Sequence, residues 1–250
     1  MSTRLVIDVG NTSIAFSLFI DGELLAPESV FTNEILNAQD MEKVLGKFLN
    51  NLDIEVTQAV ICCGVARITS ILQGCTTFEN MQISYLNGNN SGGAIIDYET
   101  PETLGPDRVA NTIAATKIYG SPVLVVDCGT AINIDFIDRD GRFSGGIIYP
   151  GLHTGRDALA SHAPALPEVQ ITGEAKLIGR NTIECIQSGL INGAVALIDH
   201  AVEEVSKDNE GIQVVLTGGH GSIIHPLIRV DAILDVHMTL KGLGLANLGV

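Results

Sequence analysis

The apolar residues of this chain gather in short runs that are rich in β-branched side chains, and two of these runs end alike. Residues 5–12 have the sequence LVIDVGNT, and residues 124–131 have the sequence LVVDCGTA. Short β-branched runs closed by glycine are typical of buried strands. Both runs therefore predict a strand that ends in one carboxylate, followed two positions later by a glycine and then by a small polar residue.

The similarity extends beyond the strand ends. Asp21 lies 13 positions after Asp8, Asp140 lies 13 positions after Asp127, and a glycine follows each. An Asp-Gly pair between apolar runs is a hairpin signal. We therefore predict two copies of one unit, made of a strand, an acidic turn, a strand, an Asp-Gly turn and a strand. Glycine lets the backbone approach a ligand, and free amides and hydroxyls donate to phosphate oxygens, so the two units suit a phosphorylated ligand.

The rest of the pattern alternates between strands and helices, which indicates an α/β layered fold. Apolar residues at helical spacing follow Asp40, a candidate N-cap, and Gly120 is a candidate end for a helix over 109–119. The other expected elements are strands over 13–20, 58–63 and 213–216, a glycine-flanked segment over 145–152 that leads into a helix, a long helix from 181–182, and a final helix over 240–248.

The composition bears mainly on partners. Hydrophobic residues make up 46% of the 250 residues, which is enough for a well-buried core. The formal net charge of −15 argues against nucleic acid and anionic membrane surfaces as main partners, because both attract clustered Lys and Arg. No apolar run is typical of a signal peptide or long enough to span a membrane, so we expect a cytoplasmic protein. The cysteines form no CxxC pair and the histidines no HExxH spacing, which favours reduced thiols and no zinc site.

Candidate catalytic residues lie between the two acidic turns. Pro106 fits a first helical turn and so places Asp107 at a helix N-terminus, where the dipole favours an ionised carboxylate. The alternative is that Asp107 only caps the helix, and helix signals alone favour it. The adjacent Arg108 and the two phosphate turns favour a catalytic role instead.

A second candidate segment follows the strand over 213–216. Its sequence is Thr-Gly-Gly-His at residues 217–220. A glycine pair at this place can lie flat along a nucleoside or form a tight turn, and the residues alone favour neither. His220 can contact an adenine ring, but a solvated loop histidine is the favoured interpretation.

Together these motifs resemble the type III pantothenate kinases, members of the acetate and sugar kinase/actin superfamily. The G-x-D-R segment at 105–108, between two acidic turns, is the most specific element. The resemblance implies two ribonuclease H-like domains with a nucleotide cleft between them, here residues 1–115 and 116–250. The motifs that carry it lie at residues 8–12, 105–108, 127–130, 145–146, 150–151, 165–167, 181–182, 188–189 and 217–219.

The resemblance also implies an activity, the ATP-dependent phosphorylation of pantothenate as the first step towards coenzyme A. Asp107 is the implied base for the hydroxyl proton, and Arg108 the implied residue that steadies the acceptor and the phosphate. Asp127 is the implied ligand of a monovalent cation, K⁺ or NH₄⁺, and Asp8 of Mg²⁺. The implied partners are the small-molecule substrate and a second copy of the chain.

Further contacts are carried over from the family position by position. The implied ATP contacts are Asp8, Val9, Gly10, Asn11, Thr12, Ser13, Ile14, Ala15, Gly129, Thr130, Gly218 and Gly219. The implied acceptor contacts are Tyr98, Gly105, Pro106, Asp107, Arg108 and Thr182. The long helix after residue 181 is the expected dimer surface, since Gly189 and Gly193 allow close approach.

Two other functions fit the same motifs. One is a non-catalytic accessory or regulatory binding protein, against which the intact acidic residues argue. The other is a kinase of a different small hydroxylated acceptor, because phosphate turns do not report acceptor identity. The chain also departs from the family pattern at Ala15 and at residues 63–66, which bears on nucleotide affinity more than on catalysis.

Overall fold

The computed structural model describes residues 3–52 and 54–248, and contacts divide the chain into two compact units. Unit 1 consists of Met1–Ile118 and His237–Val250, and unit 2 of Tyr119–Val236. The expected domains, 1–115 and 116–250, differ from this division. The first boundary is shifted by three residues, and the C-terminal segment lies with unit 1.

Unit 1 is built on a five-stranded sheet with the order β3-β2-β1-β4-β5. β1 pairs antiparallel with β2 and parallel with β4, so the chain reverses once at each hairpin and then crosses over through helices. Its strands are β1 (Thr3–Val9), β2 (Ser13–Ile20), β3 (Glu23–Phe31), β4 (Gln58–Cys63) and β5 (Gln82–Leu86).

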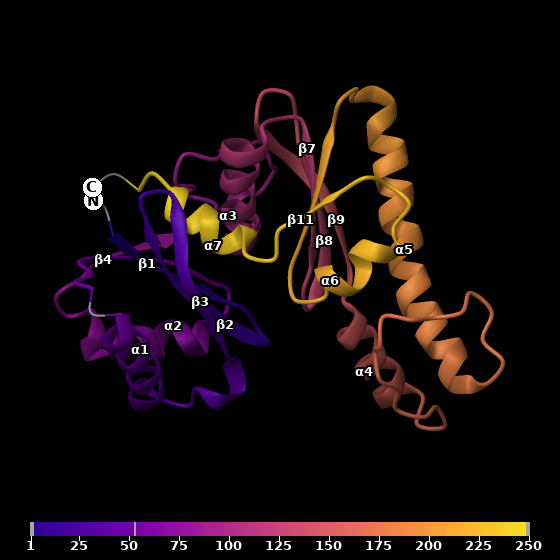
Figure 1. The fold of residues 1–250 in the computed structure, drawn as a ribbon, viewed down its shortest axis with the longest axis horizontal. Helices are drawn as coiled ribbons and strands as arrows, with labels where there is room; N and C mark the ends of the chain where they lie inside the picture. Colours follow the sequence, from indigo (N-terminus) through magenta and orange to yellow (C-terminus); the bar gives the residue numbers. More distant parts are fainter. Residues whose placement is uncertain (1–2, 53, 249–250) are drawn as a thin grey trace. The chain divides into compact units, whose positions relative to one another are not determined.

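Helices cover both faces of this sheet (Figure 1). α1 (Ala38–Leu52) and α2 (Ala66–Gln73) bury their apolar sides with Leu5 and Ile7 of β1. α3 (Pro106–Ala114) and α7 (Met238–Leu245) pack on each other, and α7 also contacts β1 and β2. This contact explains why the end of the chain belongs to unit 1.

The close packing of α7 depends on its glycines. A Cβ at Gly242 would collide with the backbone of Ala110 on α3, and a Cβ at Gly244 would collide with the ring of Phe19 on β2. Arg4 on β1 donates from Nη1 to the carbonyl oxygens of Gly244, at 3.0 Å, and Ala246, at 2.9 Å. These carbonyls lie at the end of α7, so Arg4 anchors the C-terminal end of the helix to the first strand.

Unit 2 repeats the same path. Its strands follow the order β11-β10-β7-β8-β9, with two antiparallel hairpin pairs and two parallel pairs. Each unit thus has the strand pairing expected of the repeat, and the predicted α/β fold class is confirmed. The strands are β7 (Val123–Cys128), β8 (Ala131–Ile137), β9 (Arg142–Pro150), β10 (Gln213–Thr217) and β11 (Ile233–Leu234).

The helices of unit 2 are α4 (Leu152–His162), α5 (Thr182–Asp208) and the short α6 (Gly221–Ile224). α5 begins where predicted, because the Asn181 side chain accepts a hydrogen bond from the Glu184 N–H at 2.9 Å. This helix is long and apolar enough to cross a membrane. The helix is apolar because it packs in the core of unit 2, where Ala194 and Ile198 are buried.

The shorter elements complete the chain. The 3₁₀ turns are Thr32–Glu34, Thr76–Phe78, Pro101–Thr103 and His225–Leu227, α3 continues into a π-helical turn at Ala115–Tyr119, and β6 is the two-residue strand Ile95–Ile96.

One predicted detail is wrong. Asp40 is not the N-cap of α1, because Asn37 Oδ1 accepts the Asp40 N–H at 3.1 Å while Asp40 Oδ2 accepts the Leu36 and Asn37 N–H groups. The two residues form a reciprocal capping box in which Asp40 occupies the third helical position. The strand expected after the second Asp-Gly turn is β9, which pairs with β8 and leads into α4.

Candidate active site

The acidic turn of unit 1 joins β1 to β2 and is fixed by its backbone. The Gly10 N–H donates to the Ser13 carbonyl at 2.9 Å, which closes the turn. Thr32, at the end of β3, supports it from the side. Its Oγ1 donates to the Gly10 carbonyl at 2.8 Å and its N–H to the Thr12 carbonyl at 2.9 Å. The loop is therefore held in one shape by its own sheet.

Asp8 lies at the carboxyl end of β1, next to this turn, and its carboxyl group is strongly perturbed. Cys62 on β4 donates its thiol to Asp8 Oδ1 at 3.0 Å. Burial raises the pKa of Asp8 to about 6 from 3.8, the hydrogen bond from Cys62 opposes the rise, and the negative charge of Asp107 adds to it. The structure thus brings Asp8 and Asp107 into one electrostatic environment. Perturbed carboxyl groups of this kind cluster at functional sites.

Asp107 stands in the first turn of α3, and Gly105 rather than Asp107 is the cap residue. Asp107 Oδ1 accepts the N–H of Arg108 at 2.9 Å, and a Cβ at Gly105 would lie 2.5 Å from the same oxygen. The absence of a side chain at Gly105 therefore makes room for the carboxylate. Arg108 is 6% exposed, unusually low for an arginine. Asp107 thus satisfies one N–H of the first helical turn, and this contact is compatible with both the catalytic and the capping role.

The acidic turn of unit 2 has a different support. The Gly129 N–H donates to the Ala131 carbonyl at 2.9 Å. The start of α4 then holds the Thr130 carbonyl, which accepts the Gly151 N–H at 3.1 Å and the Thr154 hydroxyl at 2.6 Å. A helix start, instead of a neighbouring strand end, fixes this turn.

Asp127 lies in a cage of glycines at the end of β7. A Cβ at Gly129 would lie 3.4 Å from Asp127 Oδ1, and one at Gly218 would collide with that oxygen. Gly218 also has φ near +83° and approaches the Cys128 backbone so closely that a Cβ would lie 2.7 Å from its carbonyl carbon. Only glycine fits at position 218. Residues 217–220 therefore form the tight turn that was one of the two predicted alternatives, and such a turn can still contact a nucleotide.

His220 is not the solvated loop histidine that the sequence favours. Its ring packs edge to face against the ring of His153, with centroids 4.4 Å apart, and its backbone N–H donates to the Cys128 carbonyl at 2.9 Å. Burial lowers the pKa of His220, with His153 and Arg156 adding to the effect, so the ring is favoured in its neutral form. Two imidazoles and a guanidinium thus gather beside the second acidic turn of an acidic protein.

The remaining predicted acceptor contacts are less closely grouped. Tyr98 is 37% exposed in the connection between β6 and α3. Thr182 lies in unit 2, at the rim of an apolar pocket of about 500 Å³ between α4 and α5. The pocket is lined by Gly155, Leu159, Leu166, Thr182, Cys185, Ile186, Gly189 and Leu190.

Sequence reasoning missed three residues that shape the site, namely Cys62, Thr32 and Thr154. Thr32 and Thr154 act through backbone carbonyls of the turns, which no sequence pattern displays. Cys62 acts on the Asp8 side chain, and its position at the end of an apolar strand is the sequence feature it shares with Asp8.

The comparisons with known proteins agree with the motifs. The family model described as type III pantothenate kinase matches residues 4–204. A type III pantothenate kinase of Agathobacter rectalis is 32% identical over 248 residues, covering 96% of this chain and 95% of the relative. One of Moorella thermoacetica is 31% identical over 246 residues, covering 96% of each. The chain belongs to the type III pantothenate kinase family.

Solved structures support the fold of this family member. A Campylobacter jejuni protein described as a Baf family transcriptional activator matches with a TM-score of 0.60 at 20% identity, covering 95% of this chain and 93% of that one. The ethanolamine utilization protein EutJ of Carboxydothermus hydrogenoformans matches with a TM-score of 0.57 at 17% identity, covering 100% and 90%. These likenesses concern the fold alone. The predicted enzyme class, a phosphotransferase, follows from the family.

The donor set of this kinase fits Mg²⁺. Asp8 supplies hard carboxylate oxygens beside the first acidic turn, and a cation there would offset the burial, and the repulsion from Asp107, that raise the pKa of Asp8. The described residues hold no group of three or more His, Cys, Asp or Glu side chains that could cage a metal ion. Mg²⁺ keeps several waters and is bound by few carboxylates together with substrate phosphates, so a single carboxylate at the turn suffices.

Proposed function

We propose that this enzyme phosphorylates the primary hydroxyl of pantothenate with ATP, with Asp107 as the general base, in the first step of coenzyme A biosynthesis. The observation that carries the assignment of the site is the carboxylate pair. Asp8 and Asp107 interact electrostatically beside a glycine turn at a strand end, and both belong to the motifs of the family.

In unit 1, positioning and charge neutralisation account for the chemistry. Asp107 accepts the hydroxyl proton as the phosphoryl group is transferred, and in a loose transition state this proton leaves late. Arg108 orients the acceptor and the phosphoryl group, and Gly105, Pro106 and Tyr98 complete the acceptor contacts. Asp8 would hold Mg²⁺, which supplies neutralisation of the phosphate charge. The residue 9–15 segment contacts ATP through its amides and the Thr12 and Ser13 hydroxyls.

In unit 2, Gly129, Thr130, Gly218 and Gly219 contact the nucleotide, and Asp127 binds K⁺ or NH₄⁺. The glycine cage supports this role, because Gly129 and Gly218 bring backbone close to the Asp127 carboxylate. Thr182 contributes a contact to pantothenate.

The decisive experiment is an ADP-release assay with purified protein and Mg-ATP. Pantothenate is compared with a panel of sugars and polyols at equal concentration. We expect ADP only with pantothenate, and mass spectrometry should show the phosphorylated product. Release of ADP with a sugar but not with pantothenate would contradict the substrate assignment, and no release with any acceptor would favour an accessory binding protein.

The monovalent cation is tested in the same assay. We expect activity to rise when potassium or ammonium replaces sodium, because Asp127 is the proposed ligand. Equal rates in the two buffers would remove the cation from the proposal. An Asp127→Asn variant should lose the stimulation while retaining its fold.

We further propose a homodimer formed through α5. The Ile183 side chain on this helix is 46% exposed, and nothing lies within 4 Å of a Cβ built at Gly189. The apolar pocket between α4 and α5 adds unpartnered apolar surface. Sedimentation should show a dimer at micromolar concentration, and Gly189→Arg should shift it towards monomer. A wild-type monomer would contradict the proposal.

The charge of −15 supports a protein of the cytoplasm whose partners include neither nucleic acid nor membrane. Cell fractionation tests the compartment, and a gel-shift assay with double-stranded DNA tests the nucleic-acid claim. Enrichment in the membrane fraction or a shifted DNA band would contradict it.

A further inference from the structure

Cys62 occupies a distinctive position opposite Asp8. The parallel register of β1 and β4 sets the two residues side by side at the carboxyl ends of their strands. The Cys62 Sγ lies 3.0 Å from Asp8 Oδ1, a short distance for a sulfur donor, and the thiol is 1% exposed. Buried cysteines usually act as small apolar side chains, so a thiol aimed at a functional carboxylate calls for an explanation.

The chemistry of the two groups sets the direction of this hydrogen bond. A thiol carries a proton that it can donate, and a carboxylate oxygen accepts, so the Cys62 Sγ donates to Asp8 Oδ1. One of the two oxygens of Asp8 is thus occupied by a fixed protein donor.

Unit 2 repeats the arrangement with a different side chain. There the parallel register of β7 and β10 sets Thr217 opposite Asp127, at the position that Cys62 holds opposite Asp8. Thr217 is 1% exposed. In both units a small residue with one S–H or O–H donor thus stands opposite the acidic residue, and the recurrence indicates a shared requirement of the site.

Resting on the function proposed above, we propose that Cys62 is a positioning residue for the phosphoryl transfer. Its thiol holds Asp8 Oδ1 and thereby fixes the orientation of the carboxylate, which directs Oδ2 to the cation that accompanies the nucleotide. Cys62 itself touches neither substrate. A thiol suits this place because it donates one hydrogen bond without adding charge beside two carboxylates.

Two variants separate this role from packing alone. Cys62→Ala removes the donor, and Cys62→Ser keeps one. We expect Cys62→Ala to raise the half-saturating Mg²⁺ concentration and to weaken Mg-ADP binding in calorimetry, each by about tenfold or more, as for a lost hydrogen bond to a charged group. Cys62→Ser should keep most of the wild-type Mg²⁺ dependence and most of the wild-type affinity for Mg-ADP. A purely structural role predicts instead that both variants lower the melting temperature and leave the Mg²⁺ dependence unchanged.

The matched control is Cys75→Ala. Cys75 is a buried cysteine of unit 1, and its thiol donates to the Ile71 carbonyl at 3.2 Å instead of to a carboxylate. This variant should keep the Mg²⁺ dependence of the wild type. If Cys75→Ala shifts the Mg²⁺ dependence as much as Cys62→Ala does, the effect is a general one of losing a buried thiol and the proposal is overturned.

A spectroscopic measurement tests the wild-type protein directly. The S–H stretching band of Cys62, identified by its loss in Cys62→Ser, should move when Mg-ADP is added, because the cation withdraws charge from the accepting carboxylate. An unmoved band despite binding overturns the proposal. This readout needs no pantothenate, so a protein that fails the ADP-release assay but shows the band shift refutes the proposed substrate and leaves the role of Cys62 standing.

Discussion

The two acidic turns share one topology but differ in what surrounds their carboxylates. In unit 1, Asp8 faces the Cys62 thiol and lies near Asp107, and its pKa is raised to about 6. In unit 2, Asp127 is enclosed by glycines, with the paired rings of His153 and His220 close to the same turn. The repeated backbone therefore surrounds its carboxylates differently, with a second acidic residue in one copy and close-packed glycines in the other.

The turns also differ in length and support. Val9 pairs with Ile14 across the first turn, whereas Cys128 pairs with Ile132 across the second, which is one residue shorter. The first turn is held by Thr32, and the second by the start of α4. The repeat thus conserves strand pairing, while the connections determine which groups reach the ligand. This is the usual division between a scaffold and its loops.

The largest effect should come from removing the base in unit 1. Asp107→Asn keeps an oxygen that can accept the Arg108 N–H, so folding should be almost unchanged. It cannot take the hydroxyl proton, so kcat should fall about a hundred- to ten-thousand-fold while Mg-ATP binding is largely retained. A rate measurement, a nucleotide titration and a thermal melt test this. Glu102→Gln, on the exposed turn before α3, is the control. Near-normal turnover of Asp107→Asn would contradict a role of Asp107 as the base.

The glycine cage of unit 2 should be the most sensitive point for stability. Gly218→Ala forces a Cβ against Asp127 and the Cys128 backbone at a positive φ, so we expect a loss of about 2–4 kcal/mol in the free energy of unfolding. Gly219→Ala is the matched control, because a Cβ there meets no atom within 4 Å. Denaturant titration compares them, and equal stability of the two variants would contradict the cage.

The raised pKa of Asp8 predicts that the free energy of unfolding depends on pH. Because the folded protein raises the pKa of this carboxyl from 3.8 to about 6, its stabilising contribution is complete below about pH 4 and is lost as the pH rises to about 6. Above that pH the ionised group destabilises the fold, by about 1–2 kcal/mol after allowance for solvent screening. In the absence of divalent cations, Asp8→Asn should therefore be more stable than the wild type near pH 8 but not near pH 4, as denaturant midpoints will show. A variant that is less stable at both pH values would contradict the shift.

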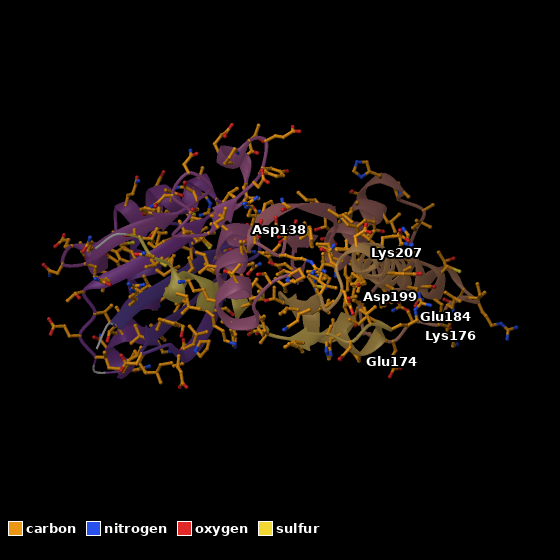
Figure 2. All side chains as sticks on the ribbon, turned by 90° about the horizontal axis from the view of Figure 1, so that it is seen from above. Asp138, Glu174, Lys176, Glu184, Asp199 and Lys207 are labelled. Carbon is orange, nitrogen blue, oxygen red and sulfur yellow. The ribbon has the colours of Figure 1, made fainter. Side chains whose placement is uncertain are left out.

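The smallest expected effect is a difference in stability between variants of the two Asp-Gly turns. Asp21 and Gly22 form a two-residue turn with positive φ values of 50° and 99°, as a type I′ turn requires. In the second turn only Gly141 has positive φ, and Asp138, labelled in Figure 2, accepts the Asp140 and Arg142 N–H groups.

Asp21→Ala should consequently cost about 0.5–1 kcal/mol, because alanine tolerates positive φ poorly. Asp140→Ala should stay within about 0.5 kcal/mol, since it loses only an exposed ion pair with Arg142. Thermal melts of the two single variants measure the difference. Equal losses would mean that the turns are conformationally alike.

Much of this protein followed from its sequence because local signals and the hydrophobic pattern agreed. The run at residues 5–12 and its counterpart at 124–131 indicated the strands, the acidic turns and the internal repeat. The N-cap at Asn181 and the first-turn Pro106 located helix starts. These features depend on neighbouring residues, for which a sequence is sufficient information.

Other features required the tertiary structure because they join residues far apart in the chain. No local pattern places α7 on α3 and β1, since that depends on where Gly242 and Gly244 permit close approach. No motif marks Cys62 as the partner of Asp8, because sheet register alone sets them opposite each other across 54 positions. The sequence thus determined which groups are available to the site, and packing decided which of them meet, because burial and register are properties of the folded chain.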